Sequence, residues 1–112
     1  MIITKTAPFT KEEIGQLAEE YKEYIKTVID IENKTCSAGG KMHADCEKKL
    51  LEKDSTQKDL WGGGIDLAAK IIDFTSLINI RPRDENPSME ILKPELREKF
   101  EELMKYFFGM FA

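Results

Sequence analysis

The chain has 112 residues, of which 41% are hydrophobic and 34% are charged, and its formal net charge is −4. This length predicts one domain over residues 1–112 with one core and leaves no room for a second domain. The acidic balance argues against a nucleic-acid partner, because such proteins carry a basic field.

The sequence contains no segment that predicts secretion or membrane insertion. Residues 1–9 are too short and too polar for a signal peptide, and no apolar run approaches the ~20 residues that cross a bilayer. We therefore expect a cytoplasmic protein without a membrane partner. Its two cysteines, Cys36 and Cys46, are too few for a disulfide scaffold and are predicted to be free thiols.

The first predicted element is a helix that begins after Thr10. Thr10 and Glu13 have the spacing of a capping box, and Phe9 and Ile14 are placed as its hydrophobic staple. Apolar residues then recur at helical spacing as far as Ile25.

From Ile25 the apolar period changes to two, which predicts a strand over residues 25–32. Its alternation places Asp30 and Glu32 on the same face. Residues 33–42 are rich in small polar residues and predict a loop, and residues 44–53 predict a short helix.

Residues 58–65 and 71–80 predict an antiparallel pair of strands joined by a turn near 66–70. The second has the most regular alternation in the chain. The glycines at 62–64 interrupt the first, which indicates either a bulge or a close backbone approach. Pro94 opens a last helix with one apolar stripe. This order predicts an α+β fold: a small, mainly antiparallel sheet on which amphipathic N-terminal and C-terminal helices and one short helix pack.

Several sequence blocks carry a resemblance to a known family. They are GGKMHADCEKKLL (39–51), QKDLWG (57–62), SLINIRP (76–82), NPSMEI (86–91) and PELREK (94–99). In combination they resemble a family of small bacterial and archaeal proteins classed as a domain of unknown function. The resemblance covers most of the chain from about residue 25 and implies no activity, cofactor or substrate.

One window concentrates the residues that bind divalent ions or transfer protons. It holds the only histidine and two acidic pairs, whose oxygen and nitrogen atoms suit Mg, Mn or Zn ions. The predicted ligands are Asp30, Glu32, His43, Asp45 and Glu47. The alternative is structural: Asp45 caps the short helix and the acids are solvated or paired with lysines.

A second polar group lies at the end of the 71–80 strand. Asn79 and Arg81 are predicted to bind substrate, because a guanidinium can hold a carboxylate or phosphate in a bidentate contact. The alternative is that Arg81 neutralises Asp30 and Glu32 across the sheet. Cys46, close to His43, is open to two readings, a thiolate nucleophile or a buried cysteine.

The C-terminal aromatic residues predict a homodimer. Phe107 and Phe108 point about 100° apart on a helix, and Phe111 adds a third direction, which is too wide an arc to bury under one sheet. Two functions follow from these features. The favoured one is a non-catalytic binding or regulatory module, and the alternative is a metal-dependent hydrolase that acts on an anionic substrate.

Overall fold

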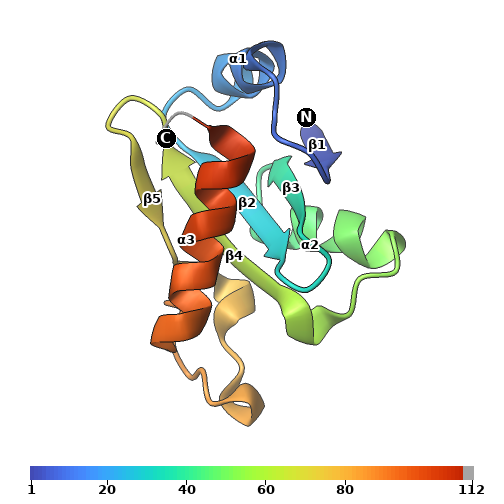
Figure 1. The fold of residues 1–112 in the computed structure, drawn as a ribbon, viewed down its shortest axis with the longest axis vertical. Coiled ribbons are helices and arrows are strands. Elements are labelled where there is room, and N and C mark those ends of the chain that lie inside the picture. Colours follow the sequence, from blue (N-terminus) through green and yellow to red (C-terminus); the bar gives the residue numbers. More distant parts are fainter. Residues whose placement is uncertain (110–112) are drawn as a thin grey trace.

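The computed structural model describes residues 1–109. Five antiparallel strands form one sheet in the order β1-β3-β2-β4-β5, and helices cover both of its faces (Figure 1). The strands are β1 (Ile2–Lys5), β2 (Ile25–Asp30), β3 (Thr35–Gly39), β4 (Leu60–Asp66) and β5 (Ile71–Asp73). The α-helices described are α1 (Lys11–Glu20), α2 (His43–Glu52) and α3 (Pro94–Phe108). The predicted α+β fold is confirmed.

Three short 3₁₀ turns complete the described elements: η1 (Gln57–Asp59), η2 (Leu77–Asn79) and η3 (Pro82–Asp84). Within residues 1–109, no helix combines the length and the hydrophobicity that a bilayer crossing requires.

The predicted start of α1 is confirmed atom by atom. The Glu13 amide donates to Thr10 Oγ1 (3.1 Å), and the Thr10 amide donates back to Glu13 Oε1 (2.8 Å). Phe9, just before this capping box, is buried. The capping box predicted from the sequence is therefore present at the start of α1, and Lys5 Nζ also donates to Glu13 Oε1 (2.9 Å).

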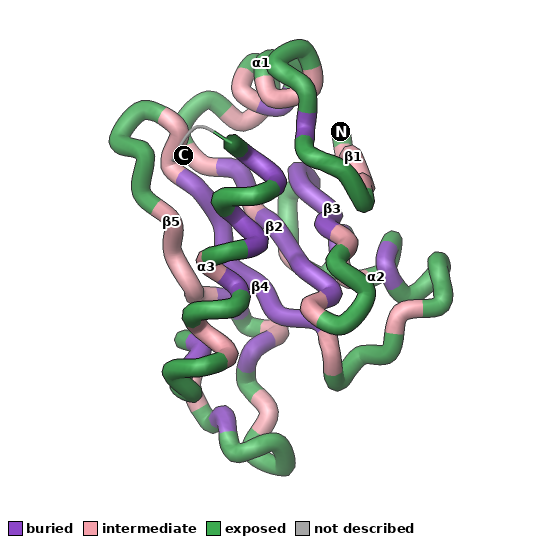
Figure 2. The backbone as a smooth tube through the Cα atoms, viewed as in Figure 1, coloured by how far each residue is buried: buried purple, intermediate pink, exposed green. Residues whose placement is uncertain are grey.

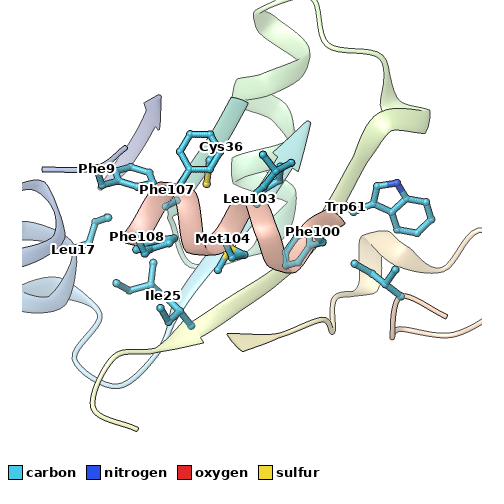
Figure 3. Close-up of a cluster of buried hydrophobic side chains, with 14 residues drawn as sticks. Phe9, Leu17, Ile25, Cys36, Trp61, Phe100, Leu103, Met104, Phe107 and Phe108 are labelled. Atoms are coloured by element: carbon cyan, nitrogen blue, oxygen red, sulfur yellow. The ribbon is translucent and has the colours of Figure 1, made fainter. Parts of the chain in front are cut away.

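The face of the sheet under α1 and α3 carries the larger apolar core. Phe100, Met104 and Phe107 of α3 are fully buried against the central strands (Figures 2 and 3). Leu17 adds the contribution of α1, and Phe9 packs beside the end of α3. Both predicted amphipathic helices thus bury their apolar stripes on the same face.

The homodimer was predicted because the aromatic residues at the end of α3 were expected to be too many to bury within one chain, and this expectation was wrong for Phe107 and Phe108. Phe107 and Phe108 are both buried within one chain, because Phe9 covers them, with its ring stacked on Phe108 at 5.0 Å between centroids. Their wide arc therefore needs no second chain. Phe111 lies outside the described residues, and the homodimer stays a prediction.

The opposite face carries a smaller core under α2. It consists of Val28, Cys46, Leu50 and Leu60, with Ile2 and Ile78 packed at its border. The segment 74–92, which contains η2 and η3, contacts both cores: Ile78 borders this one, whereas Phe74 and Ile91 pack in the larger one. The sheet thus lies between a large aromatic core on one face and a smaller core, covered partly by irregular segments, on the other.

Two expectations about strands were wrong. Residues 71–80 form only three residues of strand, after which Thr75 makes a single bridge with Glu90 and the chain turns into η2. The Ser76 hydroxyl accepts the Ile78 amide, a local bond that competes with the ladder. Residues 35–39, expected in a loop, form β3 between β1 and β2, where neighbouring strands supply the pairing.

The glycines of β4 permit close packing and make no bulge. Their register with β2 is continuous, with Gly62, Gly63 and Gly64 paired to successive residues. A Cβ on Gly62 would lie 2.7 Å from Ser76 Cβ, and one on Gly63 would lie 2.8 Å from the Phe100 ring. Of the two predicted explanations, the close approach is the one that holds.

Candidate functional site

Asp30 ends β2 as a fully buried carboxylate whose hydrogen-bond partners all belong to the fold. It accepts bonds from the Ser55 hydroxyl (2.6 Å), the Glu32 amide (3.0 Å), and the Asn33 amide (2.9 Å) and side chain (2.8 Å). Burial raises the pKa of Asp30, but these hydrogen bonds outweigh burial and leave the pKa below its ordinary value. Asp30 therefore fastens the turn after β2 to the segment that follows α2.

The other acidic residues of the predicted ligand set have separate surroundings. Glu32 is exposed in the turn after β2, Asp45 accepts the Met42 amide (3.2 Å), and Glu47 accepts Gln57 Nε2 (3.5 Å). Among residues 1–109, no three His, Cys, Asp or Glu side chains form a group that could hold a metal ion. The structure therefore does not gather the predicted ligands Asp30, Glu32, His43, Asp45 and Glu47 into one site.

His43 clips the start of α2 to β4. Its Nε2 lies 2.7 Å from the carbonyl oxygen of Gly63, so Nε2 carries the proton and donates it. Burial lowers the pKa of His43, although the hydrogen bond to Gly63 opposes this shift. The neutral ring thus keeps an unprotonated Nδ1.

Asn79 is a fully buried hub in the segment 74–92. Its Oδ1 accepts the Gly62 amide (2.8 Å), and its Nδ2 lies within hydrogen-bond distance of the carbonyls of Gly62 (2.9 Å), Met89 (2.9 Å) and Phe74 (3.2 Å). These contacts take up both ends of the carboxamide. They give Asn79 a structural role, and its predicted role in substrate binding stays a prediction.

Arg81 donates to main-chain carbonyls and stacks on Trp61. Its Nε reaches Ile78 O (3.1 Å), Nη1 reaches the carbonyls of Gln57 (3.0 Å) and Lys58 (3.2 Å), and Nη2 contacts Leu60 O. The guanidinium carbon lies 4.2 Å from the Trp61 ring centroid. Burial lowers the pKa of Arg81.

These hydrogen bonds match neither of the two roles predicted for Arg81, which were to bind an anionic substrate or to neutralise Asp30 and Glu32. Asp30 is satisfied by Ser55, Asn33 and Glu32, so it does not depend on a guanidinium. A bidentate contact of Arg81 with an anion would have to displace carbonyl partners. Its substrate-binding role stays a prediction without a contact to support it.

Both cysteines are free, as predicted, and both are buried. Burial raises the pKa of the Cys46 thiol to about 11, and Cys46 Sγ donates to the Gly39 carbonyl (3.1 Å). A nucleophilic thiolate needs a lowered pKa. Of the two readings of Cys46, the buried cysteine is the one that the surroundings favour.

A cleft on the α2 face is the strongest candidate for a binding site. Its volume is about 310 Å³, and it lies between the start of α2, strand β2 and the segment 74–92. Three large apolar side chains line it while exposed to solvent: Met42 (58%), Leu77 (65%) and Met89 (40%). The whole lining is Lys26, Lys41, Met42, His43, Ala44, Thr75, Ser76, Leu77, Ile78 and Met89.

The walls of the cleft are held by contacts already described. The His43 bond to Gly63 fixes the α2 side, while the Ser76 amide donates to Met89 O (3.0 Å) and fixes the opposite side. Asn79, the last residue of η2, ties this turn to β4 through Gly62. The apolar side chains are therefore presented by a supported backbone.

Sequence reasoning missed this cleft, although a weak signal existed. Met42 stands in a glycine-rich segment, and Leu77 falls on the polar face of the expected 71–80 strand. Large apolar residues that fall outside the periodic pattern of the core can indicate a binding site on the surface. Their convergence depends on the fold, since Met42 and Leu77 lie far apart in the chain.

A second hollow runs beside α3 and differs in charge. Lys58, Lys93 and Lys99 line it together with Asp84 and Glu95. Lys93 Nζ also lies 3.6 Å from Glu85 Oε2. Its lining contains both cations and carboxylates, so the hollow offers no field of one sign.

The chain was also compared with known proteins. A family model described as a protein of unknown function (DUF5674) matches residues 1–107. The chain belongs to this family. No curated protein and no solved structure matches it. The family adds no activity, so function has to be argued from the cleft.

Proposed function

We propose that this DUF5674 protein is a non-catalytic binding module and that the α2-face cleft receives a small, largely apolar molecule. The observation that carries the proposal is the gathering of Met42, Leu77 and Met89 around one hollow while each stays at least 40% exposed. Exposed apolar side chains that cluster mark a binding surface more often than single ones do.

The size of the cleft favours a small molecule over a protein. A volume of about 310 Å³ lies at the lower end of the range of small-molecule sites, about 300–1,000 Å³. The lining is mainly apolar with a few polar groups at defined positions, which is the usual composition of such sites. Methionine side chains adapt their shape to different ligands, and the cleft has two of them.

A hydrolase reading has less support from the same geometry. The acidic residues among 1–109 do not gather into a group that could hold a metal ion, and the raised pKa of Cys46 opposes nucleophilic attack. The metal-dependent hydrolase therefore stays a prediction from the sequence alone.

The neutral fluorescent probe N-phenyl-1-naphthylamine tests the proposal. We expect saturable binding to the intact protein and a loss of roughly tenfold in affinity for Leu77→Ser, since one leucine contributes about 1.5 kcal/mol or more when buried. Leu51→Ser is the matched control, because Leu51 is 41% exposed on α2 but does not line the cleft. Absence of saturable binding, or an equal loss in both variants, would overturn the proposal.

A further inference from the structure

The lining of the cleft carries two lysines and no carboxylate. Lys26 lies on the central strand β2, is half-buried, and lines the cleft with the exposed Lys41. The ion pairs found within residues 1–109 include neither lysine. A cation without an ion-pair partner in a mainly apolar lining favours a ligand of opposite charge.

Acidic residues around these lysines have partners of their own. Glu20, which interacts with Lys41, pairs with the Met1 ammonium group (2.7 Å). Asp73 Oδ1 accepts the Tyr24 hydroxyl (2.9 Å) and the Thr75 amide (3.3 Å), and Asp45 accepts the Met42 amide. The lining itself contains no carboxylate. The charged groups that face the cleft are therefore two ammonium groups, next to the largely neutral His43.

The surroundings of Lys26 hold its ammonium group in place. Its Nζ lies 5.7 Å from the Tyr24 ring centroid, within the range of a cation–π contact. Tyr24 is itself fixed by Asp73 and packs closely over Gly64. Lys26 is thus a positioned cation, whereas Lys41 is exposed at the rim.

We infer that the ligand of the cleft is a small amphipathic anion, with an apolar body against Met42, Leu77 and Met89 and a carboxylate that Lys26 neutralises. This inference rests on the proposed function and names its ligand class. Charge complementarity supports it, since the cleft combines an apolar wall with cations and no acid. Lys26 acts as the counter-ion, and no bond is made or broken.

An isosteric pair of probes separates the charge from the apolar body: 1-naphthaleneacetate and the neutral 1-naphthaleneacetamide. We expect the acid to bind the intact protein at least about tenfold more tightly than the amide, as a charge-assisted contact to a sheltered lysine allows. Lys26→Gln should lower the affinity for the acid to that for the amide and leave the amide unchanged. Lys26→Arg should keep the preference for the acid.

Lys48→Gln is the matched control, because it makes the same change in net charge from an exposed position on α2 that does not line the cleft. It should retain the preference for the acid. Equal binding of both probes to the intact protein would overturn the anionic ligand and leave the apolar cleft standing. Binding of neither probe would overturn the proposed function as well. A preference that survives Lys26→Gln, with folding checked by circular dichroism, would overturn the role of Lys26.

Discussion

The two faces of the sheet are covered by different physical means. Under α1 and α3, large apolar side chains such as Phe100 and Phe107 fill the space. Beside α2, the irregular segment 74–92 is held by two buried carboxamides: Asn79 binds Gly62 and Met89, and Asn86 Nδ2 reaches carbonyl oxygens within the same segment. The polar network fixes a backbone that apolar packing alone would leave undefined, and the open cleft lies beside it.

Asn79→Ala tests whether the carboxamide matters as much as an aromatic anchor. We expect it to lower the free energy of unfolding by about 4 kcal/mol, because buried main-chain groups of Gly62 lose their partner. Phe100→Ala on the other face should cost a similar amount, about 3–5 kcal/mol. Urea unfolding measures both. A loss below about 1 kcal/mol for Asn79→Ala would contradict the comparison.

Asp30→Asn tests a second polar contact of the α2 face. We expect a loss of about 3 kcal/mol at pH 7, since charge-assisted bonds from Ser55 and Asn33 are weakened. The folded pKa of Asp30 lies below its ordinary value of 3.8, so its ionised form stabilises the fold above that pH. The difference between the two proteins should therefore shrink as the pH falls below about 4.

Thermal melts with EDTA and with Mg, Mn or Zn complete this test, and Asp84→Asn serves as an exposed control with a change within about 0.5 kcal/mol. We expect no stabilisation by any of these ions. Stabilisation of the native chain by one ion, lost in Asp30→Asn, would instead restore the predicted metal site.

His43→Gln probes the single histidine of the sequence, which lies at the start of α2. Its folded pKa lies below the unfolded value of 6.5, so the unfolded chain binds more protons and stability falls as the pH drops below about 6.5. The slope for one proton is at most about 1.4 kcal/mol per pH unit. The variant, whose amide can still donate to Gly63 O, should lack this decline. Equal pH profiles between pH 5 and 7 would contradict the assignment.

Gly15→Ala gives the smallest effect and has the opposite sign. A Cβ at Gly15, in the interior of α1, would meet no atom within 4 Å. We expect stabilisation of up to about 1 kcal/mol, the difference in helix propensity between glycine and alanine. Gly63→Ala, where the added carbon would overlap the Asp73 carbonyl oxygen and the Phe100 ring, should destabilise instead. Calorimetric melting temperatures measure both changes.

The sequence predicted the regular elements of the fold better than the irregular segment beside α2. The helices could be predicted because their apolar stripes and the Thr10 cap are local, and β2 because its alternation is regular. Residues 71–80 show the same alternation, yet the buried amide of Asn79 replaces the ladder there. Alternation records which side chains are buried and does not record which groups satisfy the backbone.

The site was less predictable than the fold. Proximity along the chain brought Asp30, His43 and Asp45 together in the prediction, whereas their hydrogen bonds lead to Ser55, Gly63 and Met42. Lys26 and Leu77, which the cleft does bring together, are distant in sequence. Only the strand order of the sheet and the course of residues 74–92 place them side by side.

The hydrogen bonds of Asn79 also bear on the part of β4 that has no neighbouring strand on its outer side. β4 has seven residues and its outer neighbour β5 only three, so part of a glycine-rich strand overhangs the sheet. An open overhang of this kind invites a strand from another molecule. Here the Asn79 carboxamide occupies the amide and carbonyl of Gly62, and Arg81 occupies the carbonyl of Leu60. Two side chains thus occupy main-chain groups of β4 with which a strand of another molecule would have to pair.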